Sequence, residues 1–155
     1  QTRRIDVELV NHESEFYQRK YITAAARIRL HQRSFRVRVL EAYQSQCAFC
    51  RLKHVELLDA AHIVPDNYET GEPLVINGLS LCKIHHAAFD QNLIGVDPDY
   101  HIVVRKDILL EKDGPMLRYG IQEMHNNQLI LPKSKNQWPD RERLAQRFEQ
   151  FNRVI

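Results

Sequence analysis

Apolar residues recur at helical spacing through the first third of the chain. Residues 22–46 are rich in helix formers, with arginines on the polar faces, which predicts one or two amphipathic helices. The expected buried face carries Phe35, Val39, Leu40 and Tyr43. Residues 1–20 have mixed charge and weak periodicity, so they are interpreted as a linker or the tail of an upstream unit.

The middle of the chain alternates strand-like and helix-like segments. The run LLDAAHIVP, residues 57–65, is apolar and closed by a proline, which predicts a strand followed by the polar loop 66–73. Asn77-Gly78 predicts a turn, and the short apolar run LSL then leads into KIHHAAFDQN, residues 83–92, which has the pattern of a helix.

The last third of the chain predicts a hairpin and a closing helix. In LIGVDPDYHIVVR, two alternating runs flank Pro98-Asp99, a pair typical of a turn. Residues 106–138 show no regular pattern and are expected to be irregular. Residues 140–152 predict an amphipathic helix with its apolar positions turned inward. These positions are Leu144, Phe148 and Phe151.

Length and composition favour one folded domain. The chain has 155 residues, of which 43% are hydrophobic, enough for one core. No membrane span and no signal peptide is readable, so a cytoplasmic protein without membrane association is expected. Because the first residue is Gln1 rather than methionine, the chain is interpreted as part of something longer. We expect residues 1–25 to be a linker or tail and residues 26–155 the main domain.

Positive charge is unevenly distributed along the chain. The net charge is only +2, yet the segment 27–53 has seven basic residues and one acid, Glu41. Such a segment could contact phosphates, although a solvated helix surface would have the same composition. The candidates for phosphate contact are Arg33, Arg36, Arg51, Lys53 and, from the later helix, Lys83.

The cysteines predict a metal site rather than disulfides. Cys47 and Cys50 form a CxxC pair, and Cys82 with His85 forms a CxxH pair of the same spacing. Zinc favours four nitrogen or sulfur ligands arranged as two such pairs, and its binding free energy adds to folding. The alternative is three unrelated buried cysteines and a surface histidine, since free cysteine is a common core residue.

A second set of ligands lies on the same predicted helix. At about 100° per residue, His86 and Asp90 fall about 40° apart and roughly a quarter turn from the Cys82–His85 pair. An i, i+4 histidine and aspartate suit a hard or borderline cation, although such a pair is also a common exposed ion pair. His62 and Asn77 extend this second set.

These residues resemble a known family. CAFC, AAHIVP and INGLSLCKIHHAAFD together resemble the HNH endonucleases. The phrases LLDAAHIVPD and NGLSLCKIHHAAFD, with FRVRVLEAY and DGPMLRYG, are similar to the HNH domains of McrA-type modification-dependent restriction enzymes, including those joined to an SRA base-reading domain. The resemblance covers residues 30–152, with its catalytic core at 47–92.

The resemblance implies an α+β fold: a ββα-metal finger held by a structural zinc, with flanking helices, a C-terminal β-hairpin and a helix. It makes His62 the general base and Asn77 the brace of the loop that orients this histidine. His86 and Asp90 become the ligands of a catalytic Mg²⁺ or Mn²⁺. The structural zinc would be bound by Cys47, Cys50, Cys82 and His85.

The resemblance also implies the substrate and partners. It predicts hydrolysis of double-stranded DNA by an HNH endonuclease domain over residues 26–155, with a modified-base reader elsewhere in a longer chain. A homodimer is expected because a double-strand break needs two cuts. Many HNH enzymes have an acid or a histidine directly before the base, but this chain has Ala61, and Asp59 is the nearby candidate to compensate.

Two other functions fit the same residues. One is a zinc-containing nucleic-acid-binding module without catalysis, in which Ala61 marks a lost metal site. The other is a nuclease effector of a different antiphage system. Assay of divalent-dependent cleavage separates the first from an enzyme, and gene context separates the second.

Overall fold

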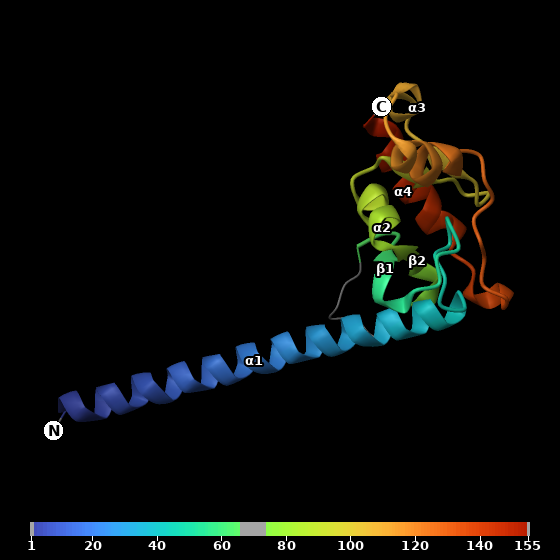
Figure 1. Cartoon of the computed structure of the whole chain (residues 1–155). Coiled ribbons are helices and arrows are strands. Elements are labelled where there is room, and N and C mark those ends of the chain that lie inside the picture. Colours follow the sequence, from blue (N-terminus) through green and yellow to red (C-terminus); the bar gives the residue numbers. More distant parts are fainter. Residues whose placement is uncertain (1, 66–73, 155) are drawn as a thin grey trace.

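The computed structural model describes residues 2–65 and 74–154, and one long helix dominates its outline. Helix α1 (Thr2–Ala42) extends far from the rest of the chain at its N-terminal end (Figure 1). Residues 2–20, interpreted from the sequence as a linker or the tail of an upstream unit, are part of this continuous helix. The predicted polar loop 66–73 lies outside the described residues.

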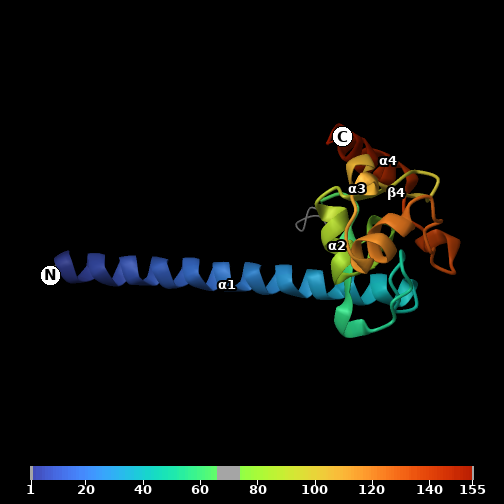
Figure 2. The same cartoon turned by 45° about the horizontal axis from the view of Figure 1, so that its top comes forward.

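The C-terminal part of α1 packs on the body of the protein. Its predicted apolar face is confirmed, since Phe35, Val39, Leu40 and Tyr43 are all buried. The helix ends at Ala42, where Gln44 and Ser45 adopt left-handed backbone angles and turn the chain. Both views show the N-terminal part of α1 without contact to the other elements (Figures 1 and 2).

A ββα unit forms the centre of the fold. Strand β1 (Leu58–His62) pairs antiparallel with β2 (Gly78–Cys82), and α2 (Lys83–Asp90) begins directly after β2. In this register His62 lies opposite Gly78. The turn predicted at Asn77-Gly78 is a short 3-10 helix, η2 (Val75–Asn77), that leads into β2. The predicted α+β class with a ββα unit is confirmed.

Gly78 permits the close approach of α1 to the ββα unit. A Cβ atom on this residue would lie 2.5 Å from Cγ2 of Val39 and 2.9 Å from Cζ of Phe35. Ordinary carbon–carbon contacts are about 3.5–4.0 Å, so no side chain fits here without movement of α1. The hydroxyl of Tyr43 also donates to the carbonyl of Gly78, at 3.2 Å. A glycine therefore sets how near the helix comes to the strands.

The predicted C-terminal hairpin and helix are confirmed. Strands β3 (Ile94–Val96) and β4 (Ile102–Val104) pair antiparallel, and α4 (Arg141–Arg153) packs on β3. Asp140 caps α4 by accepting a hydrogen bond from the backbone N–H of Arg143. Of the three predicted inward residues, Leu144 and Phe151 are buried, whereas Phe148 is half-buried and stacks on Phe151.

The segment 106–138 is less irregular than expected. It contains short helices that the sequence pattern did not predict. The side-chain amide of Gln122 donates to the carbonyls of Ile108 and Glu111 and so connects two parts of this segment. The short helices are α3 (Lys106–Leu110), the π-helical η3 (Met116–Ile121), and the 3-10 helices η4 (Gln122–Met124) and η5 (Lys135–Gln137). A further 3-10 turn, η1 (Val55–Leu57), precedes β1. Among the described helices, none combines the length and apolar character that crossing a bilayer requires.

Candidate active site and metal centre

The four predicted zinc ligands lie together. One ligand atom from each of the four residues lies within 4.8 Å of all the others. The Nδ1 atom of His85 is 3.4 Å from Sγ of Cys47 and 3.3 Å from Sγ of Cys82. Sulfur and nitrogen atoms bound to one tetrahedral zinc lie about 3.6 Å apart, so this cluster fits the ion. The four residues are Cys47, Cys50, Cys82 and His85.

The local fold presents these ligands from two elements. The CAFC segment forms a tight turn, in which the backbone N–H of Arg51 donates to the carbonyl of Cys47 and Arg51 has a left-handed φ of 65°. Cys82 ends β2 and His85 lies in the first turn of α2. The metal site therefore joins the segment after α1 to the ββα unit.

The second nitrogen of His85 is held by the backbone. Its Nε2 lies 2.6 Å from the carbonyl oxygen of Gly120, so Nε2–H donates there and Nδ1 faces the sulfurs. Burial disfavours the imidazolium, but the hydrogen bonds to Cys47 and Cys82 outweigh burial and raise the pKa of His85 to about 10. Hydrogen bonds from Cys47 and Cys50 lower the pKa of Cys82, against its burial. A buried thiolate of this kind is what zinc binds.

The second candidate site is an open pocket between α1 and the ββα unit. Two of the predicted catalytic residues, His62 at the end of β1 and His86 on α2, line it. The ring of His62 stacks on Phe35 at 4.0 Å between centroids and 9° between planes. Phe35 is buried, so it fixes the plane in which the imidazole lies. The full lining is Gln32, Phe35, Arg36, Asp59, Ala60, His62 and His86.

Asn77 lies beneath this pocket rather than in it. Its side chain is 1% exposed and bridges the backbone of Val64. The Oδ1 atom accepts from the N–H of Val64 at 3.1 Å, and Nδ2 donates to the carbonyl of Val64 at 3.0 Å. The backbone N–H of Ile63 also donates to the carbonyl of Asn77. These three bonds hold the chain directly after His62 against the start of β2.

His86 stands between two carboxylates. Its Nε2 lies 3.2 Å from Oδ2 of Asp90, one helical turn further along α2. Its Nδ1 lies 3.3 Å from Oδ2 of Asp59 on β1. The other oxygen of Asp59 accepts from Nζ of Lys83 at 2.7 Å. Burial raises the pKa of Asp59, but the hydrogen bonds from Lys83 and His86 outweigh this, so its pKa lies below 3.8.

The predicted phosphate-contacting residues differ in their freedom to bind DNA. Arg33, Arg51 and Lys53 are exposed. Arg36 instead donates from one guanidinium nitrogen to the carbonyls of Val55 and Leu58, both at 3.1 Å, and so ties α1 to β1. Lys83 is exposed but pairs with Asp59.

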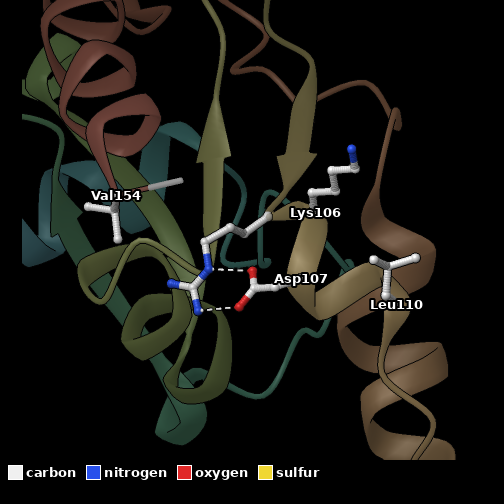
Figure 3. A pocket seen from close by; sticks show the side chains of 5 residues that line it. Lys106, Asp107, Leu110 and Val154 are labelled. Carbon is white, nitrogen blue, oxygen red and sulfur yellow. Dashed lines mark hydrogen bonds and ion pairs between the residues drawn. The ribbon is translucent and has the colours of Figure 1, made fainter.

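A separate pocket lies beside α3 and the end of α4 (Figure 3). Its residues include Arg105, whose guanidinium makes two hydrogen bonds to the carboxylate of Asp107, at 2.6 and 3.0 Å. This pairing offsets the charge of Arg105. Lys106, Leu110 and Val154 complete the lining, so this pocket shares no residue with the one around His62.

The sequence did not reveal that α1 forms a wall of the pocket. Gln32, Phe35 and Arg36 follow the i, i+3, i+4 spacing of one helix face, which marks them as neighbours but does not show what they face. Phe35 was expected only as a core residue. Its stacking on His62 depends on the approach of α1 to β1.

Part of the chain is similar to known proteins. Residues 47–97, which span the CAFC turn, the ββα unit and β3, match the family model described as HNH endonuclease. No curated protein matches the chain. Among solved structures, it is similar to a modification-dependent TagI restriction endonuclease, with 18% identity and a TM-score of 0.49. The match covers 74% of this chain and 36% of that one, so the chain spans about a third of that protein's length.

The family match includes both sets of candidate ligands and both strands that carry them. It runs over His62, Asn77, His86 and the four-residue metal cluster, which lie in the ββα unit and the CAFC turn before it. Residues 47–97, about a third of the chain, are therefore similar to the HNH endonuclease family.

Proposed function

We propose that this chain is a DNA endonuclease domain that hydrolyses phosphodiester bonds with a single catalytic divalent ion. The observation that carries the proposal is the pocket in which His62 and His86 lie together with Arg36 and Asp59, whose carboxylate pairs with the exposed Lys83. The family match at residues 47–97 supports the same activity. We assign to the chain the cleavage step of a modification-dependent restriction enzyme, because its sequence motifs resemble those of the McrA-type HNH domains.

His62 acts as the general base in this proposal. A neutral imidazole can take a proton from water near neutral pH. Stacking on Phe35 restricts rotation of the ring, and the bonds between Asn77 and Val64 hold the backbone that follows it. The base is therefore positioned before substrate arrives, and the activated water attacks phosphorus in line with the departing 3′ oxygen.

The catalytic ion is assigned to His86 and an adjacent carboxylate. In octahedral coordination, two neighbouring ligands of Mg²⁺ lie about 3 Å apart. The predicted ligands fit, since His86 Nε2 and Asp90 Oδ2 are 3.2 Å apart. A bound Mg²⁺ or Mn²⁺ supplies charge neutralisation to the scissile phosphate and the leaving oxygen. Cleavage then leaves 5′ phosphate and 3′ hydroxyl ends.

The zinc cluster has a structural role in this proposal. Four protein ligands fill a tetrahedral zinc and leave no position open for substrate. The cluster joins the CAFC turn to β2 and α2, so its binding free energy stabilises the unit that carries His86.

DNA is bound mainly through its phosphates. Arg33, Arg51 and Lys53 are exposed and free of ion pairs within the described residues, which suits them to phosphate contact. Phosphate contacts give strong salt dependence and little sequence preference. We assign recognition of a modified base to a reader domain outside this chain, and double-strand cleavage to a homodimer.

Cleavage of supercoiled plasmid tests the activity. We expect nicking that requires added Mg²⁺ or Mn²⁺ and is abolished by His62→Ala, with zinc content and DNA affinity unchanged. His101→Ala is the matched control, because this exposed histidine lies on the second hairpin, outside the pocket, and its side chain pairs with Asp97. DNA binding without any divalent-dependent cleavage by the wild-type chain would instead support a binding module. Loss of zinc in His62→Ala would overturn the assignment of His62 as base.

A further inference from the structure

Two carboxylates beside His86 are candidates for binding the catalytic ion together with this histidine. Asp59 and Asp90 lie on opposite edges of the imidazole, at 3.3 Å from Nδ1 and 3.2 Å from Nε2. Either separation fits two neighbouring ligands of one ion, which lie about 3 Å apart. The two ring nitrogens point in different directions, so a single ion binds on one edge only. The other carboxylate then accepts a hydrogen bond from the second ring nitrogen of His86.

The pocket distinguishes the two edges. Asp59, His62 and His86 all line it, whereas Asp90 does not. The side chain of Asp59 is 27% exposed and that of His86 26%, so both are partly enclosed by the pocket walls. The side chain of Asp90 is 51% exposed, at the end of α2. An ion that acts on a phosphate next to His62 must lie on the pocket side of His86, which is the edge that Asp59 occupies.

We propose that Asp59 and His86 hold the catalytic ion, and that Asp90 orients His86 from the opposite edge. This inference rests on the proposed function, which assigns a divalent ion to this pocket. In this arrangement Asp90 accepts a hydrogen bond from His86 Nε2 and fixes the tautomer that presents Nδ1 to the ion. A carboxylate behind a metal-binding histidine commonly has this role. Asp59 thus provides the carboxylate that is absent at Ala61.

Lys83 is compatible with this assignment. Its Nζ contacts Oδ1 of Asp59, whereas Oδ2 faces His86, so the lysine and the ion use different oxygens. In the protein without a divalent ion, Lys83 offsets the charge of Asp59. The side chain of Lys83 is 55% exposed and can turn toward a phosphate of bound DNA. The lysine is nevertheless a like charge beside the ion and weakens its binding.

Thiolate substitution identifies the coordinating carboxylate without DNA. Asp59→Cys and Asp90→Cys are compared with wild type by titrating Co²⁺ into zinc-loaded protein, because a thiolate bound to Co²⁺ gives a charge-transfer absorption band. We expect the new band in Asp59→Cys and not in Asp90→Cys. Any other pattern overturns the assignment of Asp59. Exchange of Co²⁺ into the zinc cluster would affect all three proteins alike and is subtracted with the wild-type spectrum.

A second measurement leaves Asp59 in place, in case its substitution disturbs folding. Lys83→Met removes the like charge, so we expect Mn²⁺ affinity, measured by the loss of the free-ion EPR signal, to rise about two- to five-fold. Lys106→Met is the matched control, since this exposed lysine lies in the other pocket. Equal affinity in Lys83→Met and wild type overturns the proposal. Both measurements are independent of cleavage, so a failed nuclease assay with a positive cobalt result would reject only the enzymatic function.

Discussion

The close contact of Gly78 with α1 offers a quantitative test of how the pocket is built. The substitution is Gly78→Ala. The backbone of this residue has φ −131° and ψ 146°, an extended conformation that alanine adopts easily. The new Cβ would lie 2.5 Å from Cγ2 of Val39 and 2.9 Å from Cζ of Phe35. Any loss of stability in Gly78→Ala therefore comes from the side-chain clash and not from backbone strain.

The expected loss of stability follows from that clash. Overpacking a core costs about 1–3 kcal/mol, and the reduced chain entropy of the unfolded alanine variant returns about 0.4–1 kcal/mol. We expect Gly78→Ala to lose roughly 1–2 kcal/mol of unfolding free energy. For a domain of this size, that corresponds to a fall in Tm of roughly 2–8 °C. Urea and thermal unfolding of zinc-loaded protein, followed by circular dichroism, measure both quantities.

A double-mutant cycle separates the clash from other causes. Val39→Ala alone removes two buried methyl groups and should cost about 2 kcal/mol. It also removes the atom nearest to the new Cβ, so the double variant should be more stable than the sum of the single effects predicts, by about 1 kcal/mol. Gly78→Ala with wild-type stability, or strictly additive effects, would refute this account of the helix–strand contact.

The same variant should also lose activity. Phe35 is the second neighbour of the new Cβ and the ring on which His62 stacks. Displacement of Phe35 therefore moves the proposed base, and we expect plasmid nicking by Gly78→Ala to fall even well below its Tm. Full activity at that temperature would show that the stacking of His62 on Phe35 does not matter for cleavage.

Three further predictions concern other parts of the chain. Cys82→Ala should reduce bound zinc from about one ion per chain to nearly none and abolish cooperative unfolding, since the cluster has four ligands. Full retention of zinc in elemental analysis would contradict this prediction. Asp140→Ala removes the cap of α4 and should cost about 0.5–2 kcal/mol in urea unfolding, without a change in zinc content. Combined Arg33→Ala and Lys53→Ala should lower the slope of log affinity against log salt by about 1 per lost phosphate contact, and an unchanged slope in a binding titration would exclude both from the interface.

Much of the fold follows from local sequence signals. The pairing of β1 with β2, the helix after it, and the Pro98-Asp99 hairpin all depend on alternation, turn residues and helical spacing between near neighbours. The cluster of four candidate metal ligands was predictable for a similar reason, because two pairs of equal spacing account for every cysteine in the chain. Short-range chemistry was sufficient for these features.

Local signals were insufficient where periodicity is weak. Residues 2–20 carry mixed charge, and their inclusion in α1 depends on helix propensity summed over many positions rather than on an apolar face. The short helices between 106 and 138 show no periodic apolar pattern, and the carbonyls at the end of α3 accept hydrogen bonds from Gln122, 11 and 14 residues further along the chain.

The types and spacings of residues along the chain were enough to single out the candidates for chemistry, namely His62, His86 and the cysteine cluster. The surroundings of these candidates were not readable from the chain and depend on how it packs. Phe35 contacts His62 because Gly78 lets α1 approach the strands, and Asp59 faces His86 because β1 lies beside α2. These contacts join residues far apart in the chain. They depend on tertiary packing, which the periodicity of the sequence does not predict.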